Sequence, residues 1–548
     1  MGLWQYPAMS STETNPPSEF AGEKAANSAA EAPRFTSQPM QLLCLALLLA
    51  LSAYLVSLGI ARSINLDETW TIYLSKYSFS ELYSRLAHDA HPPLYFFLLK
   101  VWTHLVGIAE APTRSLSALF YLLSIASCYF LVRALRGHYV AIFTSLLLAL
   151  SPLSIDVGKS ARMYSLLLLL SVISCCLFLH IFVERRDSKW MRIAYVLGNA
   201  LGTFTHYWFF FLLFGQGIAL LATKARKQIV LFSLFGTASV IPFSVLWLPN
   251  FLHQLKGTPS AWISEILPGV FEAIYQTFGA YYGGREAFVL LAVIVLSSLI
   301  AVRSAHSNSL QWKKLRFSIQ APPLHDIAEC VKTPLVVSLL IIFITSVGTP
   351  FVLSYIRPMF FARYTVVALL PFTLLLALFL DRFTFRPLAV LLLISLACTV
   401  TAKLTWAEKR PDQQKERAVA EYVLANIADG DVVIAGTMNV ATMQYHLLRQ
   451  GRETAVEVHA FPEEIELHPT WRDLKGMIAR EDEMRAEAKA LVEKLVKANR
   501  IRVWLLAGYD EEVIAWLEAE LEKYFDRVSE KRFEGIWKRR VAEWQRKS

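Results

Sequence analysis

The sequence predicts a polytopic helical membrane protein, in which a bundle of transmembrane helices is followed by a small α/β domain. Of its 548 residues, 55% are hydrophobic and only 18% are charged, whereas soluble proteins usually carry about a quarter charged residues. Apolar runs recur along the chain, and most approach the ~20 residues that a helix needs to cross ~30 Å of hydrocarbon. Beyond residue 405 the chain becomes strongly charged and these runs stop.

Eleven apolar segments are long enough to be considered as membrane spans, although two are short. They cover residues 41–61, 116–133, 139–154, 165–183, 192–206, 208–223, 228–248, 287–302, 334–354, 365–380 and 386–403. We therefore expect a bundle of about eleven transmembrane helices over residues 40–404. Residues 1–39 are rich in Ser, Ala, Glu and Pro and lack the pattern of a cleaved signal peptide, which indicates a disordered cytoplasmic tail.

The orientation follows from the basic residues between spans. Lys and Arg gather in the turns after even-numbered spans, for example at Arg185, Arg186 and Lys189, and short loops rich in these residues remain in the cytoplasm. The first loop and the domain of residues 405–548 are then expected on the extracytoplasmic side of the cytoplasmic (inner) membrane. The net charge of +9 is explained by this topology, so we predict a lipid bilayer and no nucleic acid as partner.

The C-terminal region alternates strand and helix patterns. Residues 431–436 and 501–508 are typical of buried strands, each followed by a helical pattern, at 438–449 and 510–523. Residues 532–539 are a candidate last strand. This soluble extracytoplasmic α/β domain has no Gly-rich phosphate loop, so we predict no nucleotide site in it.

The first outward loop carries the residues most suggestive of chemistry. Asp67 and Glu68 lie about six residues beyond the first span, and His91-Pro92-Pro93 leads into an aromatic stretch. Charge at a membrane face is costly to keep without a function. Carboxylates there favour acid/base chemistry or metal binding.

Other outward turns add cationic and aromatic residues. Asp156, Arg162 and Tyr164 follow the third span, and Arg357, Arg363 and Tyr364 precede the tenth. Arginines suit phosphate groups and aromatic rings suit stacking on sugars. All of these side chains are expected on one side of the membrane.

With these motifs, the chain resembles glycosyltransferase family 39, which includes protein O-mannosyltransferases and aminoarabinose transferases. The resemblance rests on Asp67-Glu68, His91-Pro92-Pro93-Leu94, Ala161-Arg162-Met163-Tyr164 and Arg363-Tyr364, and it covers essentially everything after residue 40. It implies a GT-C-like transmembrane fold and a polyprenyl-phosphate-linked hexose or pentose as donor. The acceptor, at the outer face, would be a protein, a glycolipid or an envelope polysaccharide.

The resemblance also implies roles for single residues. Asp67 matches the carboxylate that deprotonates the acceptor hydroxyl, Glu68 completes the catalytic pair, and Asp156 matches a second catalytic acidic residue. His91, Arg162, Tyr164, Arg357, Arg363 and Tyr364 are expected to bind the donor phosphate or substrate. Ala90-His91 replaces the Glu-Lys of aminoarabinose transferases, so a metal site of that type is not predicted; a divalent cation stays open.

Each of these residues has a structural alternative. Glu68 would pair with Arg62, His91 would cap the helix that opens at Pro92-Pro93, and Asp156 would cap the following helix. Arg162 and Arg357 would be interfacial anchors. His206 and Tyr207, at the end of a span, are read as part of an interfacial aromatic belt.

The competing function is a transporter or lipid flippase of the envelope glycan pathway. That class needs ionisable residues near mid-span and paired broken helices, whereas the spans here are nearly free of acidic residues. The enzyme is therefore the preferred interpretation.

Overall fold

The computed structural model describes ten stretches of the chain. These are residues 37–223, 226–257, 269–283, 332–383, 386–410, 415–436, 439–466, 474–508, 511–535 and 539–548. Most of the N-terminal tail and the predicted span at 287–302 lie outside these residues. The other ten predicted spans coincide with helices.

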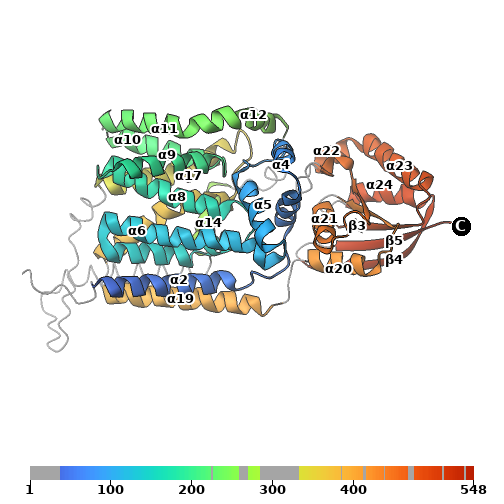
Figure 1. Ribbon diagram of the computed structural model, residues 1–548, viewed down its shortest axis with the longest axis horizontal. Coiled ribbons are helices and arrows are strands. Elements are labelled where there is room, and N and C mark those ends of the chain that lie inside the picture. The colour runs from blue at the N-terminus through green and yellow to red at the C-terminus, as the bar shows by residue number, and fades with distance from the viewer. Residues whose placement is uncertain are drawn as a thin grey trace, which may run out of the picture.

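Helices of the bundle run side by side, as Figure 1 shows. They are α2 (Gln38–Ser57), α6 (Glu110–Leu150), α8 (Tyr164–Phe178) with the π-helical turn η3 (Leu179–Val183), α9 (Lys189–Thr203), α10 (Phe209–Thr223), α11 (Arg226–Leu246), α14 (Val270–Tyr282), α17 (Pro334–Leu353), η4 (Ala362–Ala368) with α18 (Leu369–Phe383), and α19 (Arg386–Glu408). Among the described residues, six helices are long and apolar enough to cross a membrane, and α10 is a shorter apolar helix. The predicted multi-pass helical fold is thus confirmed.

The second and third predicted spans lie on either side of a kink in one helical element, α6. This element is 41 residues long and contains the second span and most of the third, whose last residues begin α7. Its backbone breaks at Gly137, which has a φ of 83°, a conformation that costs glycine little. The break lies at the end of the bundle that carries the basic turn of Arg133 and Arg136.

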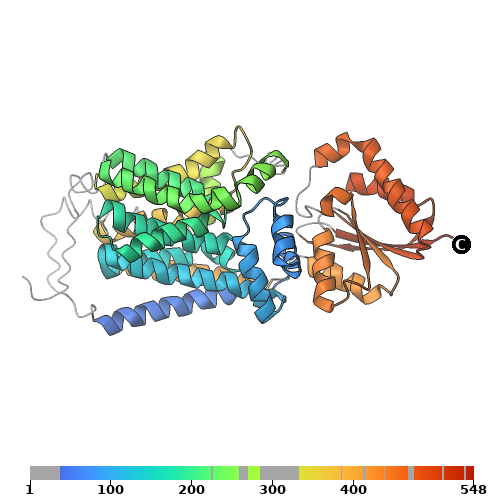
Figure 2. The same cartoon turned by 45° about the horizontal axis from the view of Figure 1, so that its top comes forward.

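Short helices cap the opposite end of the bundle. They are α3 (Leu66–Tyr73), η2 (Leu74–Lys76), α4 (Phe79–Leu86), α5 (Leu94–Val106), α7 (Pro152–Gly158) and α12 (Leu248–Gly257). In both Figure 1 and Figure 2 the helices α3 to α5 lie between the bundle and the C-terminal domain. The outward loops named in the sequence therefore lie at one end.

The C-terminal domain is built around a five-stranded sheet of order β2-β1-β3-β5-β4. Its elements are α20 (Glu416–Asn426), β1 (Val432–Gly436), α21 (Asn439–Gln450), β2 (Glu457–Phe461), η5 (Glu463–Glu466), α22 (Leu474–Ala479), α23 (Glu481–Lys497), β3 (Arg502–Ala507), α24 (Glu511–Leu521), β4 (Phe525–Phe533) and β5 (Arg539–Arg546). Strand β1 is parallel to β2 and β3, while β5 is antiparallel to β3 and β4.

Alternate residues of the central strands supply two apolar cores. Val432 and Ile434 of β1 pack with α23 and α24, whereas Val433 packs with α20 and α21, as the twofold alternation of a strand requires. The predicted strands at 431–436 and 501–508 are confirmed. The single strand predicted at 532–539 is wrong, because these residues hold the end of β4 and the start of β5.

Candidate active site

Helix α3 presents the acidic pair in its first turn. Asn65 caps the helix by accepting a hydrogen bond from the Glu68 backbone N–H at 3.0 Å, and Glu68 Oε2 accepts from the Asn65 N–H at 3.2 Å. This reciprocal arrangement is a capping box. Asp67 and Glu68 both lie in the first turn of this helix.

Glu68 is buried and its carboxylate is fully engaged. Arg114 of α6 donates to both oxygens, at 2.8 and 2.7 Å, and the Ala161 N–H donates to Oε1 at 2.7 Å. With the Asn65 cap, this leaves no acceptor capacity for a substrate. The geometry therefore favours a positioning role over the catalytic role expected from the sequence. Its partner is Arg114, and the expected pairing with Arg62 is wrong.

Asp67 is the more solvent-exposed carboxylate of the pair. Its side chain is 39% exposed, compared with 1% for Glu68. Arg363 Nη1 lies 3.5 Å from Asp67 Oδ2. Arg162 donates to the backbone carbonyl of Asp67 at 3.3 Å and to Thr71 Oγ1 at 2.7 Å. Asp67 thus keeps lone pairs available next to two cations.

Two tyrosines complete this centre. The ring of Tyr164 stacks on that of Tyr364 with a centroid distance of 5.8 Å, and the Arg363 guanidinium lies 5.7 Å from the Tyr164 centroid. The structure therefore brings Asp67, Arg162, Tyr164, Arg363 and Tyr364 together, as expected from the sequence. Arg162 is buried, so the alternative of an interfacial anchor is wrong for it.

His91 forms a buried pair with Asp89. His91 Nδ1 lies 3.2 Å from Asp89 Oδ1, and Trp70 Nε1 donates to Asp89 Oδ2 at 3.0 Å. Burial lowers the pKa of His91 more than Asp89 raises it. Burial alone would raise the Asp89 pKa, but the hydrogen bond from His91 and the charge of Arg162 hold it well below its usual range.

These directions describe an ionised Asp89 that accepts from the Nδ1–H of a neutral His91. In this tautomer the Nε2 of His91 is the acceptor nitrogen. His91 does not cap α5, because that helix has Pro93 at its N-cap and makes no side-chain capping bond. Asp89 was not predicted as a site residue, although its position two residues before His91 was a usable signal.

Asp156 faces a charged cavity at the end of α7. The cavity has a volume of about 400 Å³ and is lined by Asp156, Lys159, Arg363, Lys403 and apolar residues of α7, α14 and α19. Asp156 lies inside α7, and α8 makes no side-chain capping bond, so the capping alternative is wrong.

Opposite charges share this cavity. Desolvation by the surrounding protein raises the pKa of Asp156, while the charges of Arg363 and Lys159 act against that rise. Burial lowers the pKa of Lys159 to about 8, against the charge of Asp156. Lys159 was not singled out from the sequence, because only the fold brings it to the same cavity as Arg363.

An apolar groove of about 490 Å³ opens on the other side of Tyr364. It is lined mainly by α10, α11, α12 and residues 357–359, together with His91, His206 and Tyr364. The ring centroid of His206 lies 5.5 Å from that of His91 and 4.9 Å from that of Tyr364. Arg357 also lines the groove and donates to the Leu255 carbonyl.

His206 lines this groove, although the sequence analysis assigned it to an interfacial aromatic belt. It is buried, and its neighbour Tyr207 hydrogen-bonds with Gln254 and Trp247 within the protein. These internal contacts favour a place in the candidate site over the interfacial belt.

Metal ligands do not gather here. Within the described stretches, no group of three or more His, Cys, Asp or Glu side chains is arranged to hold a metal ion. Glu68 and Asp89 face an arginine and a histidine instead.

Comparisons with known proteins agree with this architecture. Residues 90–253 match the family model described as dolichyl-phosphate-mannose-protein mannosyltransferase. The fold is similar to ArnT from Cupriavidus metallidurans in the apo state, with 15% identity, a TM-score of 0.57 and coverage of 91% of this chain and 97% of that chain. For the same protein bound to undecaprenyl phosphate, the identity is 14%, the TM-score 0.57 and the coverage again 91% and 97%. No curated protein matches the chain.

Proposed function

We propose that this multi-pass membrane chain is an integral membrane glycosyltransferase. Its family-model match and its GT-C-like fold confirm the resemblance to glycosyltransferase family 39. It moves a hexose or pentose from a polyprenyl-phosphate donor to an acceptor at the outer face of the cytoplasmic membrane. Asp67 is the general base. The similarity in fold to ArnT bound to undecaprenyl phosphate supports a lipid-linked donor.

The observation that carries the proposal is the contact of Asp67 with Arg363, next to which the chain passes from the lining of one cavity to that of a second, unlike cavity. Asp67 contacts Arg363, which lines the charged cavity, and the adjacent Tyr364 lines the apolar groove. A polyprenyl-phosphate sugar has this polarity, with an apolar chain, an anionic phosphate and a polar sugar. The groove suits the chain, and the charged cavity suits the sugar.

The chemistry then needs a base and cations. The acceptor oxygen attacks the anomeric carbon while Asp67 takes the hydroxyl proton, and the bond between that carbon and the phosphate oxygen breaks. The leaving polyprenyl phosphate carries the electron pair and the negative charge, which Arg363 and Arg162 stabilise. Attack from the face opposite the phosphate inverts the anomeric centre.

His91 and Arg357 contribute to donor binding in this scheme. His91 Nε2, in its neutral tautomer, accepts a hydrogen bond from a donor hydroxyl or from a protonated phosphate oxygen. Arg357 and His206 line the same groove. Arg357 supplies a positive charge near the phosphate, and His206 supplies an N–H donor. Asp156 and Lys159 contact the sugar in the charged cavity.

Sidedness is supported by charge and by geometry. The basic turn with Arg185, Arg186 and Lys189 lies at one end of the bundle, and the site lies at the other, beside the C-terminal domain (Figures 1 and 2). Positive turns remain in the cytoplasm. The site and residues 405–548 are accordingly extracytoplasmic, the spans belong to residues 40–404, and residues 1–39 form a cytoplasmic tail.

A transporter or flippase is the weaker alternative. Such proteins bind substrate near mid-membrane at broken helices. In the described part of this chain, the charged and histidine side chains of the site gather at the end of the bundle, on α3, α7, η4 and the turns before α5, α8, α10 and η4. This arrangement favours surface chemistry over passage.

Purified protein in nanodiscs tests the proposal directly. Polyprenyl-phosphate sugars and the matching nucleotide sugars are offered with envelope extracts as acceptor, and transfer is followed by mass spectrometry. Transfer from the lipid donor alone is expected. Equal transfer from a nucleotide sugar without a lipid carrier would refute the donor class, and movement of intact lipid across the membrane without transfer would favour the flippase.

A further inference from the structure

The loop between α2 and α3 is held by arginine side chains along its whole length. Arg114 donates to the carbonyls of Ile60, Arg62 and Ser63 at 2.9, 2.8 and 3.2 Å. The same guanidinium holds Glu68. One side chain of the bundle therefore fixes both the path of the loop and the start of the helix that carries Asp67.

A second arginine reaches this loop from the C-terminal domain. The backbone N–H of Arg417, in α20, donates to Ser63 Oγ at 3.2 Å, and its Nη2 donates to the Ala61 carbonyl at 2.9 Å. Arg62 makes the converse contact, donating to the carbonyls of Glu408 and Arg410 in the segment that leads to the domain, at 3.3 and 2.7 Å.

Glu110 of the bundle pairs with two arginines of the C-terminal domain. It is the first residue of α6, one helical turn before Arg114, and its side chain is only 7% exposed. Its Oε1 lies 2.9 Å from Arg417 Nη2 and 2.7 Å from Arg449 Nη1 of α21. Both cations come from the C-terminal domain, and both compensate a carboxylate that burial would otherwise penalise.

Helix α21 also packs directly on α3. Tyr445, four residues before Arg449, is buried and donates to the Ile108 carbonyl at 3.0 Å. The C-terminal domain thus contacts the site-bearing loop, the start of α6 and α3 itself. A domain that was only tethered by a linker would need none of these contacts.

We propose that Arg417 and Arg449 are positioning residues, through which the C-terminal domain holds Glu110 and the loop before α3 so that Asp67 faces its substrate. The inference rests on the proposed role of Asp67. It predicts that the domain is part of the catalytic geometry, although none of its side chains touches the reacting atoms.

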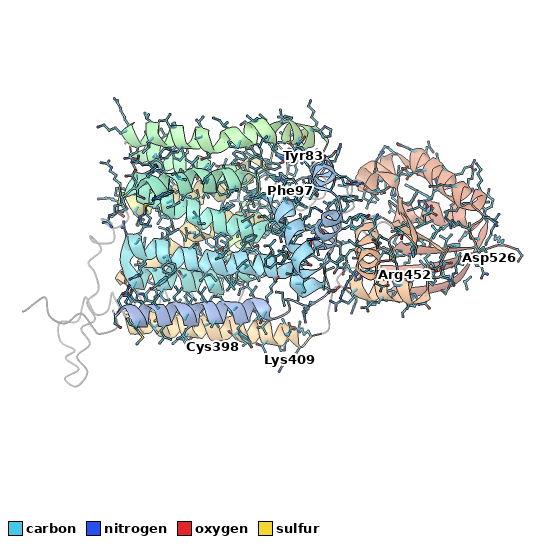
Figure 3. All side chains as sticks on the ribbon, viewed as in Figure 1. Tyr83, Phe97, Cys398, Lys409, Arg452 and Asp526 are labelled. Carbon is cyan, nitrogen blue, oxygen red and sulfur yellow. The ribbon has the colours of Figure 1, made fainter. Side chains whose placement is uncertain are left out.

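The test compares Arg417→Gln and Arg449→Gln with Arg452→Gln in the full-length chain in nanodiscs. Arg452 lies within the C-terminal domain (Figure 3), and among the described residues its guanidinium hydrogen-bonds or pairs only with Leu424 and Asp429 of that domain, so it is a matched control. Turnover, donor affinity and hydrogen–deuterium exchange of residues 59–73 are measured for each variant. Arg417→Lys, which keeps the charge, is the rescue variant.

Turnover should fall by roughly 10- to 100-fold in Arg417→Gln, the scale on which a small misplacement far from the chemistry acts. The turnover of Arg449→Gln should also fall. Donor affinity should change by less than about twofold, since the groove and the charged cavity are untouched. Amide exchange over residues 59–73 should rise in both variants, remain unchanged in Arg452→Gln and return partly in Arg417→Lys.

Contrary outcomes are distinct for the two proposals. If the wild-type protein transfers sugar and Arg417→Gln matches Arg452→Gln in turnover and exchange, the positioning role is refuted. If the wild-type protein transfers no sugar from any lipid donor, the proposed function fails, and the exchange of residues 59–73 alone decides whether the domain holds the loop. A variant whose donor affinity falls as much as its turnover would also contradict a positioning role, because the loss would then lie in donor binding.

Discussion

The guanidinium of Arg363 lies 3.5 Å from the carboxylate of Asp67, although 296 positions separate the two residues. Arg363 belongs to η4, immediately before the span of α18, and Asp67 to the first turn of α3. This contact joins the start of α3 to the turn between α17 and α18. Arg363 lines the charged cavity, and the next residue, Tyr364, lines the apolar groove.

Glu68→Gln should lower stability more than a typical surface change. The substitution removes the charge that pairs with the buried Arg114, and breaking a buried pair costs about 3–5 kcal/mol. Thermal unfolding in detergent, followed by intrinsic fluorescence, measures the loss. Asp67→Asn is the control, because Asp67 is partly exposed; equal melting temperatures for both variants would contradict the positioning role of Glu68.

Stability should decrease as the pH falls below about 6.5, the usual pKa of histidine in an unfolded chain. Burial lowers the pKa of His91 and His206 in the folded protein. Below about pH 6.5 the unfolded chain therefore binds protons that the folded chain does not. The free energy of unfolding consequently decreases as the pH decreases. Melting temperatures from pH 8 to pH 5 test this, and His206→Phe should flatten the slope.

Lys159 should give turnover an alkaline limb. Its pKa is lowered to about 8 by burial, so its positive charge beside Asp156 is lost as the pH rises through that value. Lys159→Arg stays protonated and should extend activity to higher pH, whereas Lys159→Met should be slow throughout. A pH profile of turnover checks this; an unchanged alkaline limb in Lys159→Arg would exclude Lys159 as its source.

Membrane sidedness gives an independent prediction. With the six native cysteines replaced, single cysteines are introduced at Lys189, in a basic turn, and at Glu512, on α24. An impermeant thiol reagent should label Glu512→Cys in intact spheroplasts and Lys189→Cys only after lysis. The reverse pattern would overturn the orientation and, with it, the extracytoplasmic site.

Local sequence patterns predicted the helices, but they did not predict the side-chain pairs between distant parts of the chain. Apolar length fixed the spans, and Asp67 and His91 stood out by their unusual position. The pairing of Glu68 with Arg114 crosses 46 residues, and no local pattern distinguishes Arg114 from Arg62 as its partner. Strand β4 was missed because most of its side chains are exposed and charged, which hides the twofold alternation.

Asp67→Asn is the measurement that tests the account most directly. The variant keeps the size of the side chain and removes its basicity, so the acceptor hydroxyl has no group to take its proton. General-base catalysis contributes about 10²–10⁴ in rate, and turnover should therefore fall at least roughly a hundredfold, while donor affinity in nanodiscs largely survives. Near-normal turnover in Asp67→Asn, together with an inactive Asp156→Asn, would show that Asp67 is not the base.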